Sequence, residues 1–168
     1  VVERVQAMEP TEDLGEVFEV HPLPGSHQAG PFRLEGVPLP HHVPHSGIRL
    51  AAPGAVLAYT GDAGADPALA ALGADADLLV AGTTVQESGG GPGAPGAAPE
   101  LLSAGEAGQW AARVGARRLL LTHFWPGSDR GAAIAHARAA LRAAALREPG
   151  GAGATTVTAD VLAAEEDL

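Results

Sequence analysis

The 168-residue sequence contains no cysteine and no lysine, and it has only two Trp, one Tyr and three Phe. The absence of cysteine excludes disulfides and thiolate metal ligands. With so few aromatic side chains, we expect a core built from Ala, Val and Leu. All ten basic residues are arginine, which together with the abundant Ala, Gly and Pro indicates a compositional bias rather than a binding function.

The charge and the hydropathy pattern narrow the class of protein. A formal net charge of −10 argues against non-specific nucleic-acid binding, which is driven by cationic side chains. No apolar run approaches the roughly 20 residues that a membrane span needs. The N-terminus also lacks the basic-then-apolar order of a signal peptide. We therefore expect one domain in a cytoplasmic protein without a membrane partner.

The first third of the chain has the pattern of strands. Alternating or continuous apolar residues predict four of them, at Val17–Val20, Phe32–Val37, Gly47–Ala51 and Ala55–Thr60. The Pro53-Gly54 dipeptide between the last two is typical of a turn, so these two strands are expected to form a hairpin.

Helices and strands then alternate, which predicts an α/β arrangement. Capping residues and apolar runs predict helices at Asp66–Leu72, Ser103–Val114 and Asp129–Arg147, and strands at Asp77–Ala81, Arg118–Thr122 and Thr155–Thr158. Ser103 and Glu106 have the spacing of a capping box. The segment at about 88–99 is almost entirely Gly, Pro and Ala, and we expect it to be a mobile loop.

Three polar residues lie where predicted strands end: His41, Asp62 and His123. Loops beyond strand ends hold functional groups because a rigid sheet positions them within reach of solvent. Imidazole nitrogen and carboxylate oxygen are ligands of zinc and similar ions. A His or Asp in such a place can also form a turn or cap a helix, and the spacing alone leaves both interpretations open.

Three segments resemble metallo-β-lactamase-fold hydrolases. Tyr59–Asp62 is similar to the Y-T-G-D segment whose Asp bridges two metal ions in that family, and Leu121–Phe124 to the L-T-H segment that carries the last metal-binding His. Pro40–Arg49 is similar to the H-P-V-x-x-x-G-x-R stretch ahead of the Asp. Within the superfamily, these segments point to the ribonuclease Z-like phosphodiesterase branch.

The resemblance implies a fold, a metal site and a substrate class. The fold is the C-terminal βα half of an αββα sandwich, spanning residues 1–168 as a partial domain. In the complete family site, two zinc ions are held, with His41 and His123 each on one ion and Asp62 between them. His42 and His45 lie close enough in sequence to tune the site. The implied substrate is a phosphodiester, or otherwise a small ester or lactone.

The sequence also departs from the family pattern. The H-x-H-x-D-H motif that supplies most family ligands is not among the 168 residues. Gly82 stands where the branch has a Glu, and Leu101 where many relatives have a His. Three ligands shared between two ions are fewer than a catalytic zinc normally has. We therefore expect a metal-dependent hydrolase that is inactive as this isolated chain.

Two alternatives remain open at this point. The chain could be a non-catalytic scaffold or binding descendant of the fold, or a truncated gene product. A truncated product would expose one apolar sheet face and favour a homodimer. The short segment from His41 to Asp62 leaves no room for the projecting arm that grips tRNA in ribonuclease Z, which argues against a tRNA partner.

Overall fold

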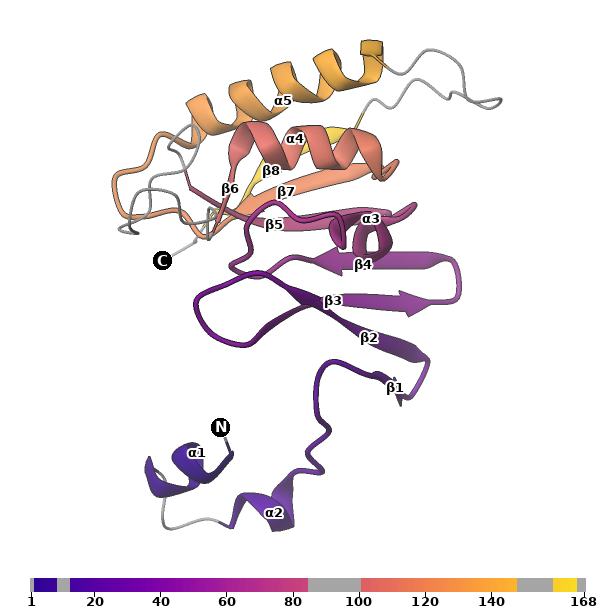
Figure 1. Cartoon of the computed structure of the whole chain (residues 1–168), viewed down its shortest axis with the longest axis vertical. Helices are drawn as coiled ribbons and strands as arrows, with labels where there is room; N and C mark the ends of the chain where they lie inside the picture. Colours follow the sequence, from indigo (N-terminus) through magenta and orange to yellow (C-terminus); the bar gives the residue numbers. More distant parts are fainter. Residues whose placement is uncertain (1, 9–12, 85–100, 148–158, 166–168) are drawn as a thin grey trace.

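The computed structural model describes residues 2–8, 13–84, 101–147 and 159–165, which form a mixed α/β structure around one sheet (Figure 1). The sheet has the order β1-β2-β3-β4-β5-β7-β8, with β6 paired to β5. Its strands are β1 Ser26–Ala29, β2 Phe32–Leu39, β3 His45–Ala52, β4 Ala55–Tyr59, β5 Leu78–Thr84, β6 Leu102–Ser103, β7 Arg118–Thr122 and β8 Asp160–Ala163. The helices are α1 Val2–Met8, α2 Leu14–Val17, α3 Leu69–Gly73, α4 Ala104–Arg113 and α5 Arg130–Arg147.

Strands β1 to β4 form an antiparallel meander. The predicted hairpin is confirmed: β3 and β4 pair from Ile48↔Tyr59 to Ala52↔Ala55. Gly54 lies in its turn with φ +81°, a left-handed conformation that glycine adopts without steric cost. Beyond β4 the pairing becomes parallel, through β5 and β7 to β8. Because parallel neighbours need crossover connections, helices α3, α4 and α5 fall in this second part of the chain.

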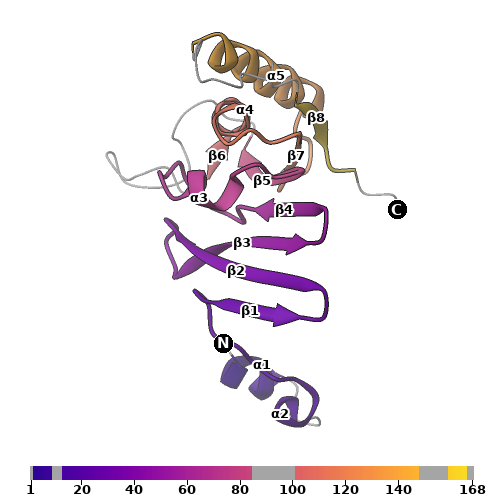
Figure 2. The same ribbon diagram turned by 90° about the vertical axis from the view of Figure 1, so that its right-hand side faces the viewer.

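Helices α3, α4 and α5 cover one face of the sheet, and Figure 2 shows α4 and α5 over its β7–β8 end. The strand residues that face these helices are buried, among them the register row Ala58, Leu79, Leu119 and Val161. Most of the core is Ala and Leu, as the composition predicts. The capping box of α4 is also confirmed: the Glu106 amide donates to Ser103 Oγ over 3.2 Å, and the Ser103 amide donates to the Glu106 carboxylate.

The small core residues allow close helix packing. On α4, Gly108 faces the backbone of Ala137 on α5, and a Cβ at position 108 would overlap the Ala137 carbonyl oxygen. Gly105, one turn earlier on the same helix, has no atom closer than 4.0 Å to such a Cβ. Gly108 therefore sets the distance between the two helices that cover the sheet.

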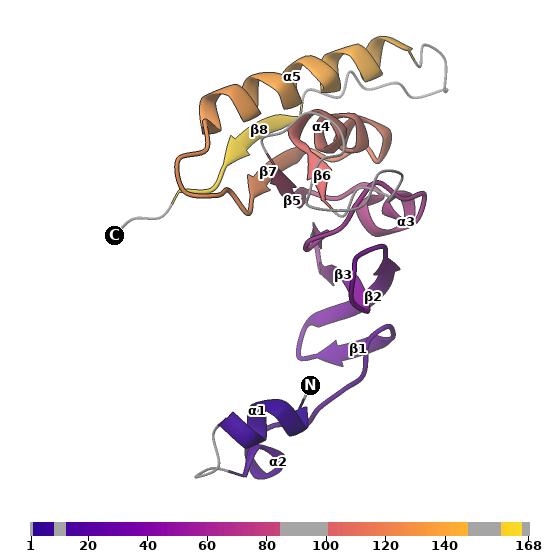
Figure 3. The same ribbon diagram turned by 60° about the vertical axis from the view of Figure 1, so that its left-hand side comes forward.

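The opposite face of the sheet carries apolar side chains. Ile48, Tyr59, Val80, Leu120 and Leu162 form a register row across five strands, and none of them is fully buried. Within the described residues, the helices that pack on the sheet all lie on the other side of it (Figures 2 and 3). This row is consequently an apolar surface open to a covering layer.

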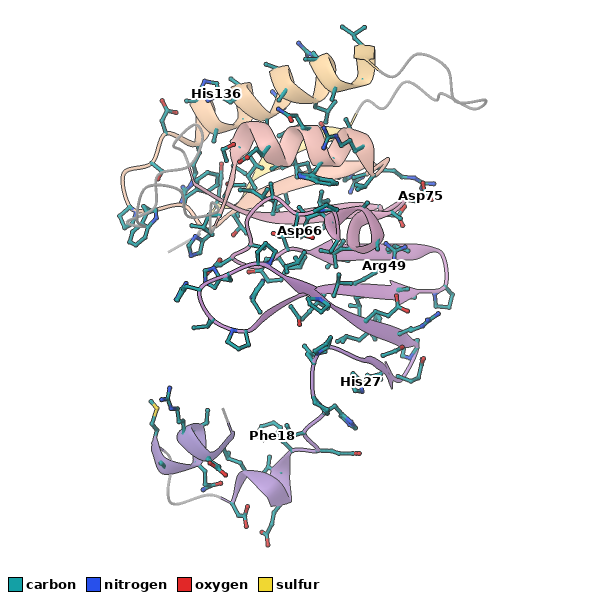
Figure 4. The ribbon with its side chains drawn as sticks, viewed as in Figure 1. Phe18, His27, Arg49, Asp66, Asp75 and His136 are labelled. Carbon is teal, nitrogen blue, oxygen red and sulfur yellow. The ribbon has the colours of Figure 1, made fainter. Side chains whose placement is uncertain are left out.

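The predicted strand at Val17–Val20 is wrong. The Asp13 carboxylate accepts a hydrogen bond from the Gly15 amide, and the chain forms the short helix α2, which ends at Val17. Phe18 follows α2 as an exposed side chain beyond the β1 edge of the sheet (Figure 4). The predictions for the loop at about 88–99 and the strand at 155–158 fall outside the described residues. In the part of the chain that is described, no helix is long and apolar enough to cross a membrane.

We expect Gly108→Ala to lower the free energy of unfolding by about 1–3 kcal/mol, because the added methyl overpacks the contact with α5. Gly105→Ala is the matched control in the same helix. It is expected to leave stability unchanged or to raise it by up to about 1 kcal/mol, since alanine is the better helix former. Equilibrium urea unfolding of both variants measures the difference, and equal stabilities would contradict the close packing.

Candidate functional site

Asp62 and His123 meet at the edge of the sheet where the parallel strands end. Asp62 lies three residues beyond β4, and His123 directly follows β7. Asp62 Oδ2 and His123 Nε2 are 3.4 Å apart, and each side chain is 38% exposed. The structure therefore brings together two of the three predicted metal ligands, in a place that solvent can reach.

These two residues come from strands that are not neighbours. Strand β5 lies between β4 and β7, so their backbones are separated by about 10 Å, twice the spacing of paired strands. Gly82 of β5 pairs with Thr122, the residue before His123. A Cβ at Gly82 would overlap the Gly61 carbonyl oxygen and lie 3.3 Å from Asp62 Oδ1. The bare glycine backbone thus leaves the space that the Gly61 turn and the Asp62 carboxylate occupy.

This observation gives a physical reason for one departure from the family pattern. The resemblance implies a Glu at the position of Gly82. With the backbone of this chain, the turn at Gly61 occupies the space that any side chain at position 82 would enter. Glycine at position 82 therefore allows the turn that carries Asp62 to lie this close to β5.

The backbone at His123 is unusual. His123 has φ +67°, a left-handed conformation that few residues other than glycine adopt, although His does so more readily than most. Such a conformation costs of order 1–3 kcal/mol and persists where the surrounding structure holds it. At His123 it ends β7 abruptly, and it coincides with the contact to Asp62.

A buried hydroxyl holds the turn that carries Asp62, and the sequence analysis missed it. Thr60 is 1% exposed, and its amide donates to the Val80 carbonyl over 3.0 Å. Its Oγ1 donates to the Gly61 carbonyl over 2.9 Å and accepts from the Gly82 amide over 3.1 Å. Thr60 therefore ties the Gly61 turn to β5. The signal available in the sequence was a polar residue at the end of an apolar strand.

His41, the third predicted ligand, lies among the other histidines of its loop. Its ring centroid is 4.1 Å from that of His42 and 5.6 Å from that of His45. The backbone next to it reaches the Asp62 loop, because the Gly64 amide donates to the Pro40 carbonyl over 3.3 Å. The loop of His41 is therefore attached to the loop of Asp62.

The two candidate tuning residues have different surroundings. His45 Nε2 is 2.8 Å from the Thr60 carbonyl oxygen, and its ring fills the space beside Gly61. His45 consequently supports the same turn as Thr60 does. His42 is exposed and contacts the ring of His41.

The candidate ligands are of the types that bind zinc, but among the described residues fewer of them lie together than a catalytic zinc normally has. A carboxylate oxygen and an imidazole nitrogen are both common zinc ligands. Among the described residues, however, no three His, Asp or Glu side chains are arranged to hold one ion. Asp62 and His123 form a two-donor pair, and a catalytic zinc normally has three protein ligands.

Comparison with known proteins identifies the family. The family model of the beta-lactamase superfamily domain matches residues 2–124, which include His41, Asp62 and His123. The chain belongs to this superfamily. The uncharacterized protein Rv1339 of Mycobacterium tuberculosis is 35% identical over 132 residues, covering 76% of this chain and 46% of that protein. The chain thus spans about half the length of the curated relatives it matches.

Solved structures agree on the fold. The metallo-beta-lactamase fold protein YhfI from Bacillus subtilis superposes with a TM-score of 0.67 at 20% identity, covering 89% of this chain and 54% of that one. Igni18, a metallo hydrolase from Ignicoccus hospitalis, superposes with a TM-score of 0.60 at 12% identity, covering 96% and 62%. The predicted fold class, a mixed α/β structure of the metallo-β-lactamase type, is confirmed.

Gly82→Ala tests whether the glycine holds the site together. We expect the methyl group to push the Gly61–Asp62 turn away from β5, because it would overlap the Gly61 carbonyl oxygen. The amide resonances of Gly61 and Asp62 in a ¹⁵N–¹H spectrum should shift strongly, and stability should fall by about 1–3 kcal/mol. Gly105→Ala, on α4, should leave both resonances in place. Unchanged resonances in the Gly82 variant would show that the turn does not depend on the glycine.

Proposed function

We propose that this chain carries part of the active site of a zinc-dependent phosphodiesterase, with His41, Asp62 and His123 as its metal ligands. The observation that carries the proposal is the approach of Asp62 and His123 to 3.4 Å at the edge of the sheet, with the Asp62 turn held against the bare backbone of Gly82. Membership of the beta-lactamase superfamily supports a metal-dependent hydrolase. The Tyr59–Asp62 and Leu121–Phe124 segments support a phosphodiester as the substrate class.

The chemistry follows from the donors. Zinc bound at these residues supplies a Lewis acid for the phosphoryl oxygens and a water that is activated near neutral pH. Asp62 offers a carboxylate that can reach metal from an exposed turn, and His123 offers Nε2 beside it. Thr60 and His45 keep the Asp62 turn against β5, so that the carboxylate is positioned before any ligand arrives.

We further propose that these three residues need additional ligands for catalysis. Two donors lie together here, and the curated relatives are about twice as long as the part of them that this chain matches. The open apolar row from Ile48 to Leu162 offers a surface for a second layer that could bring such ligands. The 168 residues alone should accordingly bind zinc weakly and lack turnover.

Zinc titration followed by calorimetry tests the metal site. We expect weak binding to the chain, and a loss of affinity of about tenfold or more in Asp62→Asn and His123→Gln, since each removes a direct ligand. Asp160→Asn and His136→Gln are the matched controls, because Asp160 lies on β8 and His136 on α5. Affinity that is unchanged in Asp62→Asn would remove the site assignment.

Hydrolysis of bis(4-nitrophenyl) phosphate tests the need for further ligands. With saturating zinc, we expect the 168-residue chain to release nitrophenolate no faster than zinc alone, because a two-donor pair does not complete a catalytic site. A turnover that disappears in Asp62→Asn would contradict this expectation and would show that the 168 residues suffice for hydrolysis with Asp62 at the site.

A further inference from the structure

A hollow of about 340 Å³ lies directly beyond His123. The described residues that line it come from the end of β7 and the loop that follows, the first residue of α5 and a residue that follows β8: Thr122, His123, Phe124, Trp125, Pro126, Arg130 and Ala164. His123 belongs both to this wall and to the pair with Asp62. A molecule in the hollow therefore lies next to the candidate metal ligands.

The hollow has two aromatic residues in a chain that has few. Phe124 packs partly against the core, whereas Trp125 is 68% exposed. The ring centroids of His123 and Trp125 are 6.5 Å apart, with their planes nearly perpendicular at 76°. An exposed indole contributes nothing to the core, but it offers a flat surface on which another ring can stack.

The hollow also carries a positive charge. The guanidinium of Arg130 lies over the ring of Phe124, with Cζ 5.8 Å from the ring centroid. In the part of the chain that the structure describes, no carboxylate forms an ion pair with Arg130. The carboxylate of its neighbour Asp129 accepts a hydrogen bond from the Ala132 amide instead. Arg130 thus keeps its donors available, in a protein whose formal net charge is −10.

The second arginine–tryptophan pair of the chain provides a contrast. Arg113 lies over Trp110 at 5.1 Å, but both belong to α4, and Trp110 packs against the core. Packing accounts for Trp110. It does not account for Trp125, which is exposed in a hollow beside a candidate metal ligand.

We propose that this hollow binds the planar ring and the phosphoryl group of an aryl phosphodiester, with the ring stacked on Trp125 and the negative charge next to Arg130. The aromatic ring of an aryl phosphodiester can stack on an exposed aromatic side chain, and its negative charge can be bound by a guanidinium. Arg130 and His123 line the same hollow as Trp125, within which the phosphoryl group is held. This substrate class rests on the proposed function and makes it more specific.

Binding is tested without zinc, so that it does not depend on the metal site. The ligands are diphenyl phosphate, diethyl phosphate and thymidine 5′-monophosphate, titrated in the presence of a chelator and followed by calorimetry. We expect diphenyl phosphate to bind at least about fivefold more tightly than diethyl phosphate, because only the former stacks. Thymidine monophosphate carries more negative charge than the diesters, so its affinity is compared between the unchanged chain and Trp125→Ala. Weaker binding in the variant would identify the nucleobase as a ring that stacks on the indole, and unchanged binding would show that its charge alone holds it.

Variants locate the binding. Trp125→Ala and Arg130→Gln should each weaken binding of diphenyl phosphate by about fivefold or more. Arg113→Gln, from the α4 pair, should leave it unchanged. In a Trp110→Phe chain, where Trp125 is the remaining indole, diphenyl phosphate should quench the fluorescence. Because Trp125 is exposed, its replacement should not impair folding, which circular dichroism checks.

The outcomes separate this proposal from the metal site. Equal affinity for diphenyl and diethyl phosphate, or unchanged affinity in Trp125→Ala, would overturn the assignment of the hollow, whatever the zinc titration shows. Diphenyl phosphate binding that persists in Asp62→Asn supports the hollow as a site that forms without the metal ligands. Loss of zinc binding in the same Asp62 variant is then a separate result about the proposed function.

Discussion

The arrangement of the site depends on one constraint: Asp62 and His123 must meet across a strand that separates their own strands. Parallel pairing in the order β4, β5, β7 brings their backbones to the same edge of the sheet, but leaves them two strand spacings apart. Gly82 leaves room for the turn that carries Asp62, and Thr60 bonds both to the Gly82 amide and to the turn ahead of Asp62. The left-handed backbone of His123 turns the chain at the end of β7. Each of these features would be unnecessary without the others.

The composition, which looks like a simple bias toward small residues, has structural consequences at two places. Gly82 lets the Asp62 turn lie against β5, and Gly108 lets α4 lie against α5. In both, the glycine faces a backbone carbonyl oxygen of the neighbouring segment, which cannot move aside as the end of a long side chain can. Closely packed interiors transmit such overlaps, so the small residues at these positions determine the spacing of strands and helices. A bias in composition and a structural requirement can therefore coincide at the same residue.

The sequence predicted the regular elements that have strong local signals. The β3–β4 hairpin follows from alternation around Pro53-Gly54, and α4 from the spacing of Ser103 and Glu106. Prediction from the sequence failed for short segments whose structure depends on the residues that cap them or the strands that pair with them. The apolar residues at 17–20 resemble a strand, but Asp13 caps a helix there. Strand β1 has four residues and depends on its antiparallel pairing with β2. The strand Asp160–Ala163 was likewise not predicted, and the predicted strand at 155–158 lies outside the described residues.

In the candidate site, too, some features could be predicted from the sequence and others could not. The sequence predicted that Asp62 and His123 each follow the end of a strand, and the parallel pairing of β4, β5 and β7 brings these ends to one edge. The position of the His41 ring, the bond of His45 to the Thr60 carbonyl and the space at Gly82 are products of tertiary packing, and no local pattern encodes them. A glycine inside an apolar strand was a visible signal, since such a residue often marks a close approach of another backbone.

Three consecutive residues of the loop after β7 have three different surroundings. His123 contacts Asp62, Phe124 packs partly against the core beneath Arg130, and Trp125 is exposed in the hollow. Because the loop is anchored at Phe124, a ring stacked on Trp125 and a metal held by His123 constrain the same short piece of backbone. Ordering of this loop by one ligand reduces the entropy that the other must remove, which favours their binding together. Under the proposed function, substrate recognition and metal ligation belong to one turn, in which the left-handed His123 directly precedes the core-anchored Phe124 and the exposed Trp125.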